Sequence, residues 1–254
     1  MSMPLEPAMD RTRARHYPET GAGGFSRVDG TVQFFSRVQA LLQPGDIILE
    51  FGAGRGAELR EDPVPFRRSL RSLRGRAGRV IGVDVDPAVL TNPFLDEAHV
   101  IEPNDRLPLA DASVDIIVSD HVFEHVTDAA HVARELGRVL RPGGWICART
   151  PNRWSYVGLG INLIPNRLHA RLLQALQPGR KALDVFPTRY RLNSFGALTR
   201  NFPPGSFEHH SYGCDAEPVY VGAVSPAWWL MRAVHRFSPR AWRGVLFVFI
   251  RKVG

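Results

Sequence analysis

Four short apolar runs, each followed by a turn and most by a segment with helical periodicity, are the strongest constraint on the fold of this 254-residue chain. They are DIILEF (46–51), RVIGVD (79–84), VDIIVSD (114–120) and WICART (145–150), and HVI (99–101) is a briefer run of the same kind. Strands that are apolar along their whole length are typical of parallel sheets buried between helices. The pattern therefore predicts an α/β, doubly wound fold with helices on both faces.

The regular alternation covers only part of the chain. Residues 1–30 are rich in Pro, Gly and charge, which predicts a loose N-terminal arm. Residues 31–254 are expected to form a single domain, with the regular alternation in 31–150 and a less regular half in 151–254. Helices are predicted over 31–42, 128–140 and 227–237, and VLFVFIRK (245–252) is predicted to be a final strand.

The charge balance favours anionic partners without selecting one. The formal net charge is +7, which suits nucleic acid, phosphorylated small molecules or an anionic membrane face. Six arginines gather in residues 62–79, a segment that we interpret as an insertion before the second strand. Two cysteines, Cys147 and Cys214, cannot form a disulfide framework, so we expect a reduced, cytoplasmic protein.

The loop LEFGAGRGA (49–57) is the most informative motif in the sequence. Glycine allows positive φ angles and close approach of a ligand to the backbone, and the following helix offers free N–H groups. The loop fits two cofactor patterns: G-x-G-x-x-G/A, the dinucleotide fingerprint, and E-x-G-x-G-x-G, which begins at Glu50. Asp84 ends the next strand, where a carboxylate can accept hydrogen bonds from ribose hydroxyls.

Four motifs, taken in order, resemble the class I S-adenosylmethionine-dependent methyltransferases. They are ILEFGAGRG (48–56), VIGVDVDP (80–87), LPLADASVDIIVSDHVFEHV (107–126) and LRPGGWICARTPN (140–152). The series L-P-x-x-D-x-S-x-D, x-E-H-V and L-R-P-G-G is much more specific than a glycine loop. The resemblance implies a Rossmann-like, seven-stranded sheet of order 3-2-1-4-5-7-6, in which the last strand is antiparallel.

The resemblance also implies roles for individual residues toward S-adenosyl-L-methionine. Glu50 should lie near the methionine amine, and Asp84 with Val85 should hold the ribose. Asn104 or Asp105 would face the adenine amine. Residues expected against the cofactor backbone or beside the sulfonium are Phe51, Gly52, Ala53, Gly54, Ser119 and Asp120.

The stretch SDHVFEHV (119–126) has the H-x-x-E-H spacing of one class of zinc protease. A zinc site needs a third protein ligand, and no further motif supplies one, so we expect no metal. Instead, a histidine here could serve as a general base for methyl transfer to a hydroxyl or amine. The candidate bases are His121, His125, His209 and His210.

The acceptor is expected to bind the half formed by 151–254, which also supplies lid elements. Arginine forks suit phosphate and carboxylate groups, and the candidates are Arg153, Arg189, Tyr190 and Arg191. The apolar segments 156–164 and 227–237 could cover a pocket, form a dimer seam or rest on a lipid surface.

The favoured interpretation is O-methylation of a small or lipid-linked anionic acceptor, such as a sugar or glycan precursor, with peripheral contact at the inner face of the membrane as an option. An RNA methyltransferase is the alternative within the class. A NAD-dependent reductase and a non-catalytic cofactor-binding module are less favoured, and the oligomeric state stays open.

Overall fold

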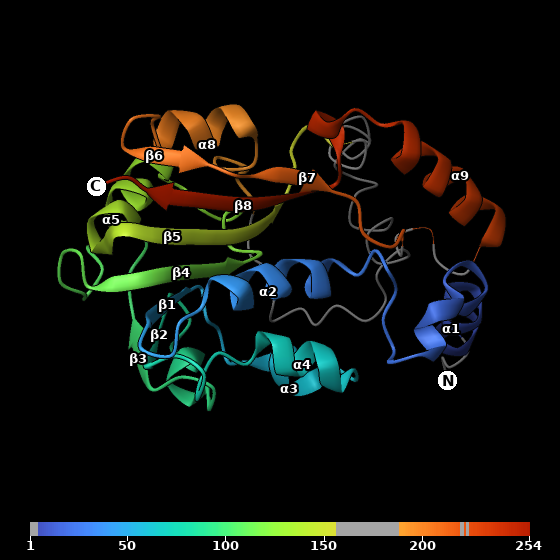
Figure 1. The fold of residues 1–254 in the computed structure, drawn as a ribbon, viewed down its shortest axis with the longest axis horizontal. Coiled ribbons are helices and arrows are strands. Elements are labelled where there is room, and N and C mark those ends of the chain that lie inside the picture. Colours follow the sequence, from blue (N-terminus) through green and yellow to red (C-terminus); the bar gives the residue numbers. More distant parts are fainter. Residues whose placement is uncertain (1–4, 156–187, 219–220, 222–223) are drawn as a thin grey trace.

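The computed structural model describes residues 5–155, 188–218, 221 and 224–254, and one sheet of eight strands forms its centre (Figure 1). The strands are β1 (Ile47–Phe51), β2 (Arg79–Asp84), β3 (Glu97–Val100), β4 (Val114–Asp120), β5 (Leu140–Pro151), β6 (Phe207–His209), β7 (Tyr212–Cys214) and β8 (Val245–Lys252). Their order is β3-β2-β1-β4-β5-β8-β6, and β7 also pairs with β8. The pairs among β1 to β5 are parallel, whereas β8 runs antiparallel to β5, β6 and β7.

The predicted strand order is confirmed, because the final strand lies between β5 and β6 and is antiparallel. The one difference is that the predicted sixth strand is interrupted into β6 and β7, which keep the same register against β8. At the break, the backbone N–H of Phe249 donates to the Ser211 hydroxyl at 3.1 Å. A side-chain acceptor takes the place of a backbone carbonyl there, so the ladder is broken for two residues.

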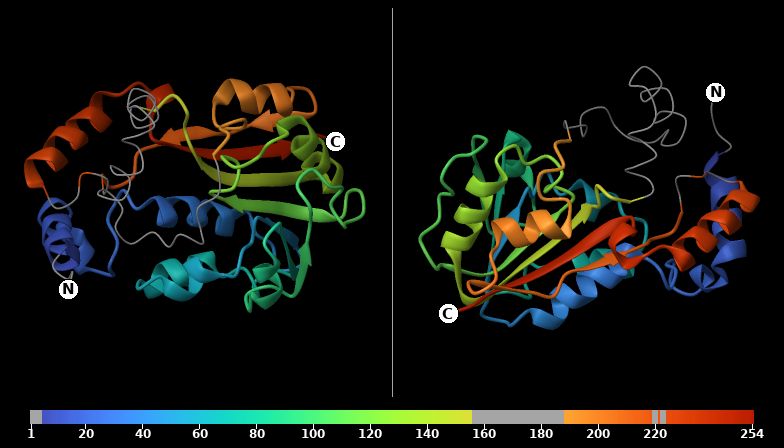
Figure 2. Two further views of the ribbon diagram at one scale, coloured as in Figure 1. Left: turned by 180° about the vertical axis from the view of Figure 1, so that it is seen from behind. Right: turned by 90° about the horizontal axis from the view of Figure 1, so that it is seen from above.

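Helices cover both faces of the sheet, as the doubly wound prediction requires (Figure 2). On one face lie α2 (Gly30–Leu41), α3 (Ala57–Glu61) and α4 (Pro65–Arg71), and on the other lie α5 (Ala129–Val139) and α8 (Phe195–Asn201). Because both α3 and α4 fall between β1 and β2, the arginine-rich segment forms helical structure on the α2 side. Short 3₁₀ helices occur at η1 (Pro18–Gly21), η2 (Pro87–Thr91) and η5 (Arg240–Trp242).

The pleat of the central strands divides the core into two layers. Ile48 packs in one layer with Phe34 and Phe35 of α2, while its neighbour Leu49 packs in the other layer with Leu136 of α5. Successive strand residues point to opposite faces, and here both faces are covered. This accounts for strands that are apolar along their whole length.

The N-terminal segment is not the loose arm that the composition predicts. α1 (Leu5–His16) is a helix, and it packs against α9 (Ser225–Phe237) near the other end of the chain. His16 and Tyr17 are buried, and the His16 ring stacks on Trp228 with 5.5 Å between centroids. These long-range aromatic contacts outweigh the Pro- and Gly-rich composition of residues 1–30.

The parallel strands end at a common edge of the sheet, which positions the site described below. β8 runs the opposite way, toward the C-terminus marked in Figure 1, so this edge faces the end of the molecule where α1 and α9 lie. The apolar segment 156–164, expected to contribute to a lid, lies outside the described residues.

Candidate functional site

A cavity of about 590 Å³ opens at the carboxyl ends of β1, β2 and β4. In α/β sheets ligands bind at this edge, where the strand order reverses. Eight of the eleven residues predicted to bind the cofactor line it: Glu50, Phe51, Gly52, Ala53, Gly54, Asp84, Val85 and Asp120. The sequence therefore located most of one continuous cavity wall.

The glycine loop between β1 and α3 shows where a ligand can approach the backbone. A Cβ on Gly52 would lie 2.2 Å from Cγ2 of Val122, so this glycine is required by protein packing. A Cβ on Gly54 would meet only Asp84 Oδ2, at 4.0 Å, so it would project into open space in the cavity. Both residues have positive φ angles, +79° and +50°. The surface at Gly54 is thus a cradle that a side chain would fill.

Asp84 and Asn92 hold this cradle in place. Asp84 Oδ2 accepts a hydrogen bond from the Gly54 N–H at 2.7 Å, and its Oδ1 accepts from the Asp86 N–H at 2.8 Å. Each carboxylate oxygen has a further lone pair for a ligand hydroxyl. The Asn92 amide donates to the carbonyls of Ala53 and Gly54, both at 3.1 Å. Asn92 was not predicted as a site residue, and its local sequence carries no signal of this contact.

Glu50 lines the base of the cavity in an environment that disfavours its charge. Burial, together with the nearby negative charge of Asp120, raises the pKa of Glu50 to about 7, although Arg71 opposes the shift. A ligand ammonium group beside this carboxyl would favour the ionised form. The Glu50 carboxylate is therefore poorly stabilised in the free protein and becomes paired with a positive charge when such a ligand binds.

Asp120 is engaged by arginines from two other elements. The guanidinium of Arg149 on β5 donates to both carboxylate oxygens, at 2.6 and 2.7 Å, and Arg71 on α4 approaches at 3.2 Å. Although burial opposes ionisation, Arg149 holds the pKa of Asp120 well below its usual range. Asp120 lines the cavity, as predicted, and it also joins β4 to β5 and α4.

His121 and Glu124 form a second polar group beside this cluster. Nδ1 of His121 lies 3.4 Å from Glu124 Oε1, while Glu124 Oε2 accepts a hydrogen bond from the Thr150 hydroxyl at 2.8 Å. Thr150 accepts in turn from the Asn193 amide at 2.6 Å. Although burial opposes it, the interactions with His121 and Thr150 lower the pKa of Glu124. The carboxylate is thus buried, fixed and directed at the histidine ring.

His121 also borders a second, smaller cavity of about 220 Å³. Its walls include Arg13 of α1, Thr31 of α2, Arg149 of β5 and Phe247 of β8. His121 is the residue common to both cavities, which places its ring between them. The His121 backbone has φ = 58°, so a left-handed turn directly after β4 aims the side chain there.

The other candidate bases lie in different places. His125 lines the larger cavity. Nε2 of His209 is hydrogen-bonded to the Phe202 carbonyl at 2.7 Å. The centroid of the His210 ring lies 5.3 Å from that of Trp145, a residue of β5 on the side of the amino-terminal ends of the parallel strands. His209 and His210 are therefore away from the common carboxyl edge and do not line either cavity.

Three residues predicted to contact the cofactor lie outside the cavity lining. Ser119 is buried, and among the described residues its hydroxyl has no hydrogen-bond partner. Asn104 and Asp105 are exposed in the loop after β3, where they contact Thr127 and His131. On this side the cavity is lined instead by Phe94 and Ile101.

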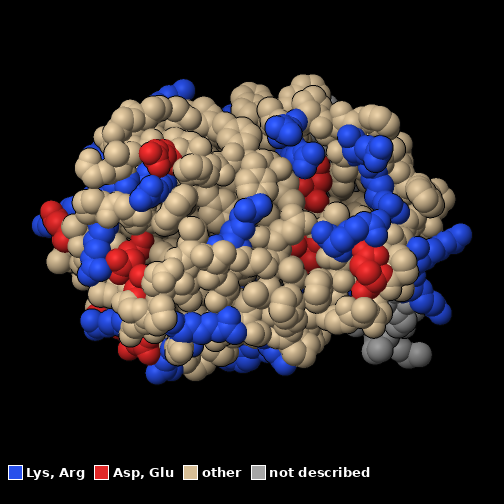
Figure 3. Space-filling view, viewed as in Figure 1, with Lys and Arg blue, Asp and Glu red and all other residues tan. Residues whose placement is uncertain are grey.

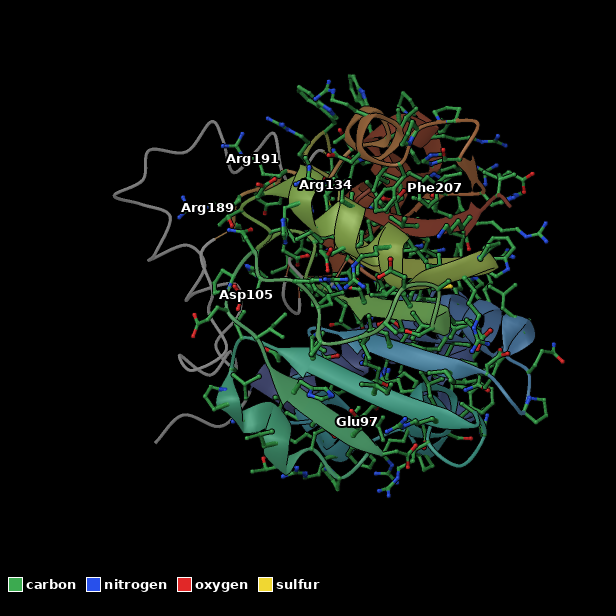
Figure 4. All side chains as sticks on the ribbon, turned by 90° about the vertical axis from the view of Figure 1, so that its left-hand side faces the viewer. Glu97, Asp105, Arg134, Arg189, Arg191 and Phe207 are labelled. Atoms are coloured by element: carbon green, nitrogen blue, oxygen red, sulfur yellow. The ribbon has the colours of Figure 1, made fainter. Side chains whose placement is uncertain are left out.

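Two of the four predicted acceptor-binding residues, Arg189 and Tyr190, contact the backbone of Glu124. The backbone N–H groups of Arg189 and Tyr190 both donate to the Glu124 carbonyl, at 2.6 and 3.1 Å, and the Arg153 N–H donates to the Asn193 carbonyl. Figure 4 shows Arg189 and Arg191 on the same side of the molecule as Asp105, while Glu97 and Phe207 mark the two edges of the sheet. The three arginines are exposed and do not line the cavities.

The H-x-x-E-H spacing has a non-metal explanation here. Its glutamate pairs with the first histidine and with Thr150, and its second histidine lines the larger cavity. Among the residues that the structure describes, no group of three or more His, Cys, Asp or Glu could hold a metal ion.

Comparison with known proteins agrees with this geometry. Residues 49–148 match the methyltransferase domain family. The chain is 37% identical over 140 residues to a protein of Mycolicibacterium smegmatis named "Probable S-adenosylmethionine-dependent methyltransferase", covering 52% of this chain and 48% of that one. It is 28% identical over 130 residues to the ubiquinone biosynthesis O-methyltransferase of Hydrogenovibrio crunogenus, covering 48% of each. The chain thus spans about half the length of these relatives.

A solved structure extends the likeness of fold beyond the matched domain. The geranyl diphosphate C-methyltransferase of Streptomyces coelicolor, solved with Mg²⁺, geranyl diphosphate and S-adenosyl-L-homocysteine, aligns with a TM-score of 0.52 at 16% identity. The alignment covers 88% of this chain and 76% of that one. The cradle at Gly54 and the fixed carboxylate of Asp84 agree with the methyltransferase domain family that residues 49–148 match.

Proposed function

We propose that this chain transfers a methyl group from S-adenosyl-L-methionine to an oxygen of a small or lipid-linked acceptor, with His121 as the general base. The observation that carries this proposal is the position of His121 between two cavities, with Glu124 fixed behind its ring. The larger cavity would hold the cofactor and the smaller one the reacting part of the acceptor.

The lining of the larger cavity suits two polar parts of the cofactor, the methionine ammonium and the ribose hydroxyls. Glu50 would pair with the methionine ammonium, and the carboxylate of Asp84 would accept from the ribose hydroxyls. The open backbone at Gly54 would lie against the cofactor between them. S-adenosyl-L-methionine supplies the reactive methyl group and a neutral thioether leaving group.

His121 would act as the general base that removes the proton of the acceptor hydroxyl. Nδ1 lies 3.4 Å from Glu124 Oε1. Nε2, which lies 3.8 Å from Asp120 Oδ1, would take the hydroxyl proton as the oxygen gains its bond to the methyl carbon. The buried carboxylate then stabilises the imidazolium that forms. Because Thr150 and Asn193 hold Glu124, the ring keeps this orientation between the cavities.

An anionic acceptor is supported by the exposed arginines beside the site. Arg153, Arg189 and Arg191 can form bidentate contacts with phosphate or carboxylate groups. The base is consistent with oxygen as the methylated atom, since a hydroxyl must lose a proton, although an amine acceptor would use the base in the same way. The ubiquinone biosynthesis O-methyltransferase among the relatives is consistent with this chemistry.

The alternatives receive less support. The net charge of +7 kept RNA possible, but Arg67, Arg71, Arg74 and Arg79 all form ion pairs with carboxylates of this chain. A NAD-dependent reductase does not account for the methyltransferase domain over residues 49–148. A non-catalytic module does not account for the buried Glu124 behind His121.

Calorimetric titration with S-adenosyl-L-methionine, S-adenosyl-L-homocysteine and NADH tests the cofactor. We expect binding of the first two and not of NADH. Binding of NADH alone, or of none of the three, would contradict the proposal. Radioactive methyl uptake by anionic glycans, isoprenoid and other lipid phosphates, and RNA would then identify the acceptor.

The base is tested with His121→Asn, because asparagine tolerates the positive φ of this position. We expect kcat to fall about 10²- to 10⁴-fold while cofactor affinity stays within about threefold, because a base acts on the acceptor proton. His125→Asn is the matched control in the same cavity and should retain most activity. If His125→Asn abolished turnover and His121→Asn did not, the base assignment would be wrong.

A further inference from the structure

The apolar face of α9 points away from the protein. Residues at helical spacing along this face, Trp229, Leu230 and Phe237, have relative exposures of 62%, 64% and 80%. Ala233 and Pro226 between them are exposed as well. A surface helix of a globular domain normally turns its apolar stripe to the core. The exposed apolar face of α9 therefore indicates that another molecule covers it.

The exposed apolar side chains are concentrated in this region. Of the eleven large hydrophobic residues that are exposed in the described part of the chain, five lie between residues 224 and 242. Besides the three on α9, they are Val224 before the helix and Trp242 in η5, which is 52% exposed. Scattered exposed hydrophobic residues need no explanation, but a contiguous group indicates an interaction surface.

The packing of α9 on α1 fixes this face outward. Trp228 is fully buried against His16 and Tyr17, and the Arg232 guanidinium lies 5.3 Å from the Tyr17 ring centroid and 5.1 Å from that of Trp229. His16 Nε2 is 3.0 Å from the Ser225 hydroxyl at the start of the helix. The buried side of α9 is thus held by specific contacts.

The surroundings of the apolar face are basic. Residues 224–243 contain four arginines and no Asp or Glu. Arg243 lies 3.9 Å from Asp215, whereas Arg236 and Arg240 beside the apolar face are exposed. In the space-filling view, Lys and Arg side chains lie over the end formed by α1 and α9, with acidic residues among them (Figure 3). Trp, Leu and Phe beside arginine is the composition of helices that lie in the headgroup region of a bilayer.

We propose that α9, with Trp242, is an interfacial helix that docks this protein on an anionic lipid surface. Basic residues near such a surface are attracted to acidic headgroups, and the apolar face enters the boundary of the acyl chains. A second copy of the chain is the less suitable occupant, because two-fold pairing would bring Arg236 and Arg240 of both copies together with no carboxylate from 218–254 to match them.

The docking surface lies at the end of the molecule toward which the parallel strands point (Figure 1). Arg13 of α1 forms one wall of the smaller cavity beside His121. A protein docked through α9 would therefore hold this cavity close to the lipid headgroups. None of the helices in the described residues has the length and apolarity to cross a membrane, so contact through α9 is peripheral.

Vesicle sedimentation with the full chain tests docking without requiring turnover. Vesicles of phosphatidylcholine alone and of phosphatidylcholine with 30% phosphatidylglycerol are the probes. We expect at least tenfold tighter binding to the anionic vesicles, weakening as salt rises. No binding to the anionic vesicles would overturn the proposal, whatever the outcome of cofactor titration.

Two pairs of substitutions distinguish binding through the apolar face of α9 from nonspecific hydrophobic adsorption to vesicles. Leu230→Gln with Phe237→Gln should weaken vesicle binding at least tenfold, while Leu90→Gln with Phe66→Gln, exposed by 62% and 45% in η2 and α4, should not. Equal loss in both pairs would overturn the assignment to α9. Arg236→Gln with Arg240→Gln should remove most of the preference for anionic lipid.

Sedimentation equilibrium of the same variants tests the other occupant. We expect the same oligomeric state for the wild type and for Leu230→Gln with Phe237→Gln. A wild-type dimer that becomes monomeric in this variant would show that a second copy covers the face, and the lipid proposal would fall.

Discussion

The environment of Glu50 favours the protonated carboxyl, whereas its expected role requires the ionised carboxylate. Its pKa of about 7 reflects burial and the neighbouring Asp120, whereas the proposed partner, an ammonium group, requires the ionised carboxylate. A site that disfavours a charge before binding and favours it afterwards couples ligand affinity to pH.

We expect affinity for S-adenosyl-L-methionine to fall as the pH drops below about 7, because Glu50 then binds a proton that the ligand must displace. Affinity should also decline above about pH 8, where an α-amino group loses its charge. Calorimetry between pH 5.5 and 9 checks this. Glu50→Gln should bind more weakly and lose the dependence below pH 7; an unchanged slope in that variant would contradict the role of Glu50.

The same shift predicts a cost in stability. A carboxyl whose folded pKa lies above its unfolded value of 4.5 binds more protons in the folded state, so stability falls as the pH rises from about 4.5 to about 7. At pH 8, Glu50→Gln should therefore raise the free energy of unfolding, by up to about 3 kcal/mol. Urea denaturation at pH 4.5 and pH 8 should show the gain only at the higher pH.

The glycine loop offers a paired test at the level of the β1–α3 element. Alanine at either Gly52 or Gly54 adopts a positive φ, which costs about 1–2 kcal/mol. At Gly52 the Cβ also overlaps Val122, which adds about 1–3 kcal/mol. Gly54→Ala should fold with the smaller loss, yet lose at least tenfold in cofactor affinity, since its methyl group fills the cradle.

Denaturation curves and calorimetry on both glycine variants separate the two roles. If Gly54→Ala bound the cofactor as tightly as the wild type, the cradle would not be the cofactor surface.

The ion-pair cluster joins β4, β5 and α4. Asp120→Asn leaves the buried guanidinium of Arg149 without its main partner, so we expect a loss of about 3–5 kcal/mol in the free energy of unfolding. Asp120→Leu with Arg149→Met removes both charges and should cost less than the single change. A single substitution costing under about 1 kcal/mol would show that the pair is not buried in solution.

The elements were largely predictable because local pattern and tertiary packing agree in them. Strands β2, β4 and β8 begin and end where their apolar runs do, since both faces are buried. Helix α1 was not predictable, because its buried end depends on Trp228, over 200 residues away. The break between β6 and β7 depends on one serine hydroxyl replacing a backbone acceptor.

The part of the candidate site formed by residues at strand ends could be predicted from the sequence. Glu50, the glycine loop, Asp84 and Asp120 follow strand ends that meet at one edge, so their proximity could be expected. The partners of His121 could be found only in part: Glu124 lies three residues away in the sequence, but Thr150 and Asn193 come from distant segments. His209 and His210 line neither cavity; an adjacent pair of histidines carries no information about which sheet edge it occupies.

At the scale of the whole molecule, the α1–α9 pair lies beyond the carboxyl ends of the parallel strands, and α1 and the sheet both contribute to the wall of the smaller cavity (Figure 1). Arg13 of α1 pairs with Glu217 through two hydrogen bonds, at 2.6 and 2.9 Å, and both residues line that cavity. Arg67, Arg71, Arg74 and Arg79 near the sheet are paired with acids, whereas Arg236 and Arg240 at the α9 end are exposed.

The contact between α1 and α9 should weaken on acidification. Burial, with the positive charges of Arg232 and Arg15, lowers the pKa of His16 below 6.5. Between that lowered value and 6.5 the unfolded chain binds more protons than the folded one, so this contribution to stability is present above about pH 6.5 and is lost as the pH falls. We expect protection of the α1 amides against hydrogen exchange, corrected for intrinsic rates, to drop between pH 7 and pH 5.

His16→Phe is the informative variant, because a phenyl ring can keep the stack on Trp228 but cannot be protonated. Its α1 amides should show the same protection at pH 5 as at pH 7, apart from a uniform loss due to the missing hydrogen bond to Ser225. Amides of β4 and β5, which are far from His16, provide the internal reference. If the phenylalanine variant loses protection with falling pH as steeply as the wild type, another group controls the contact, and the charge on His16 does not link pH to the packing of α1 on α9.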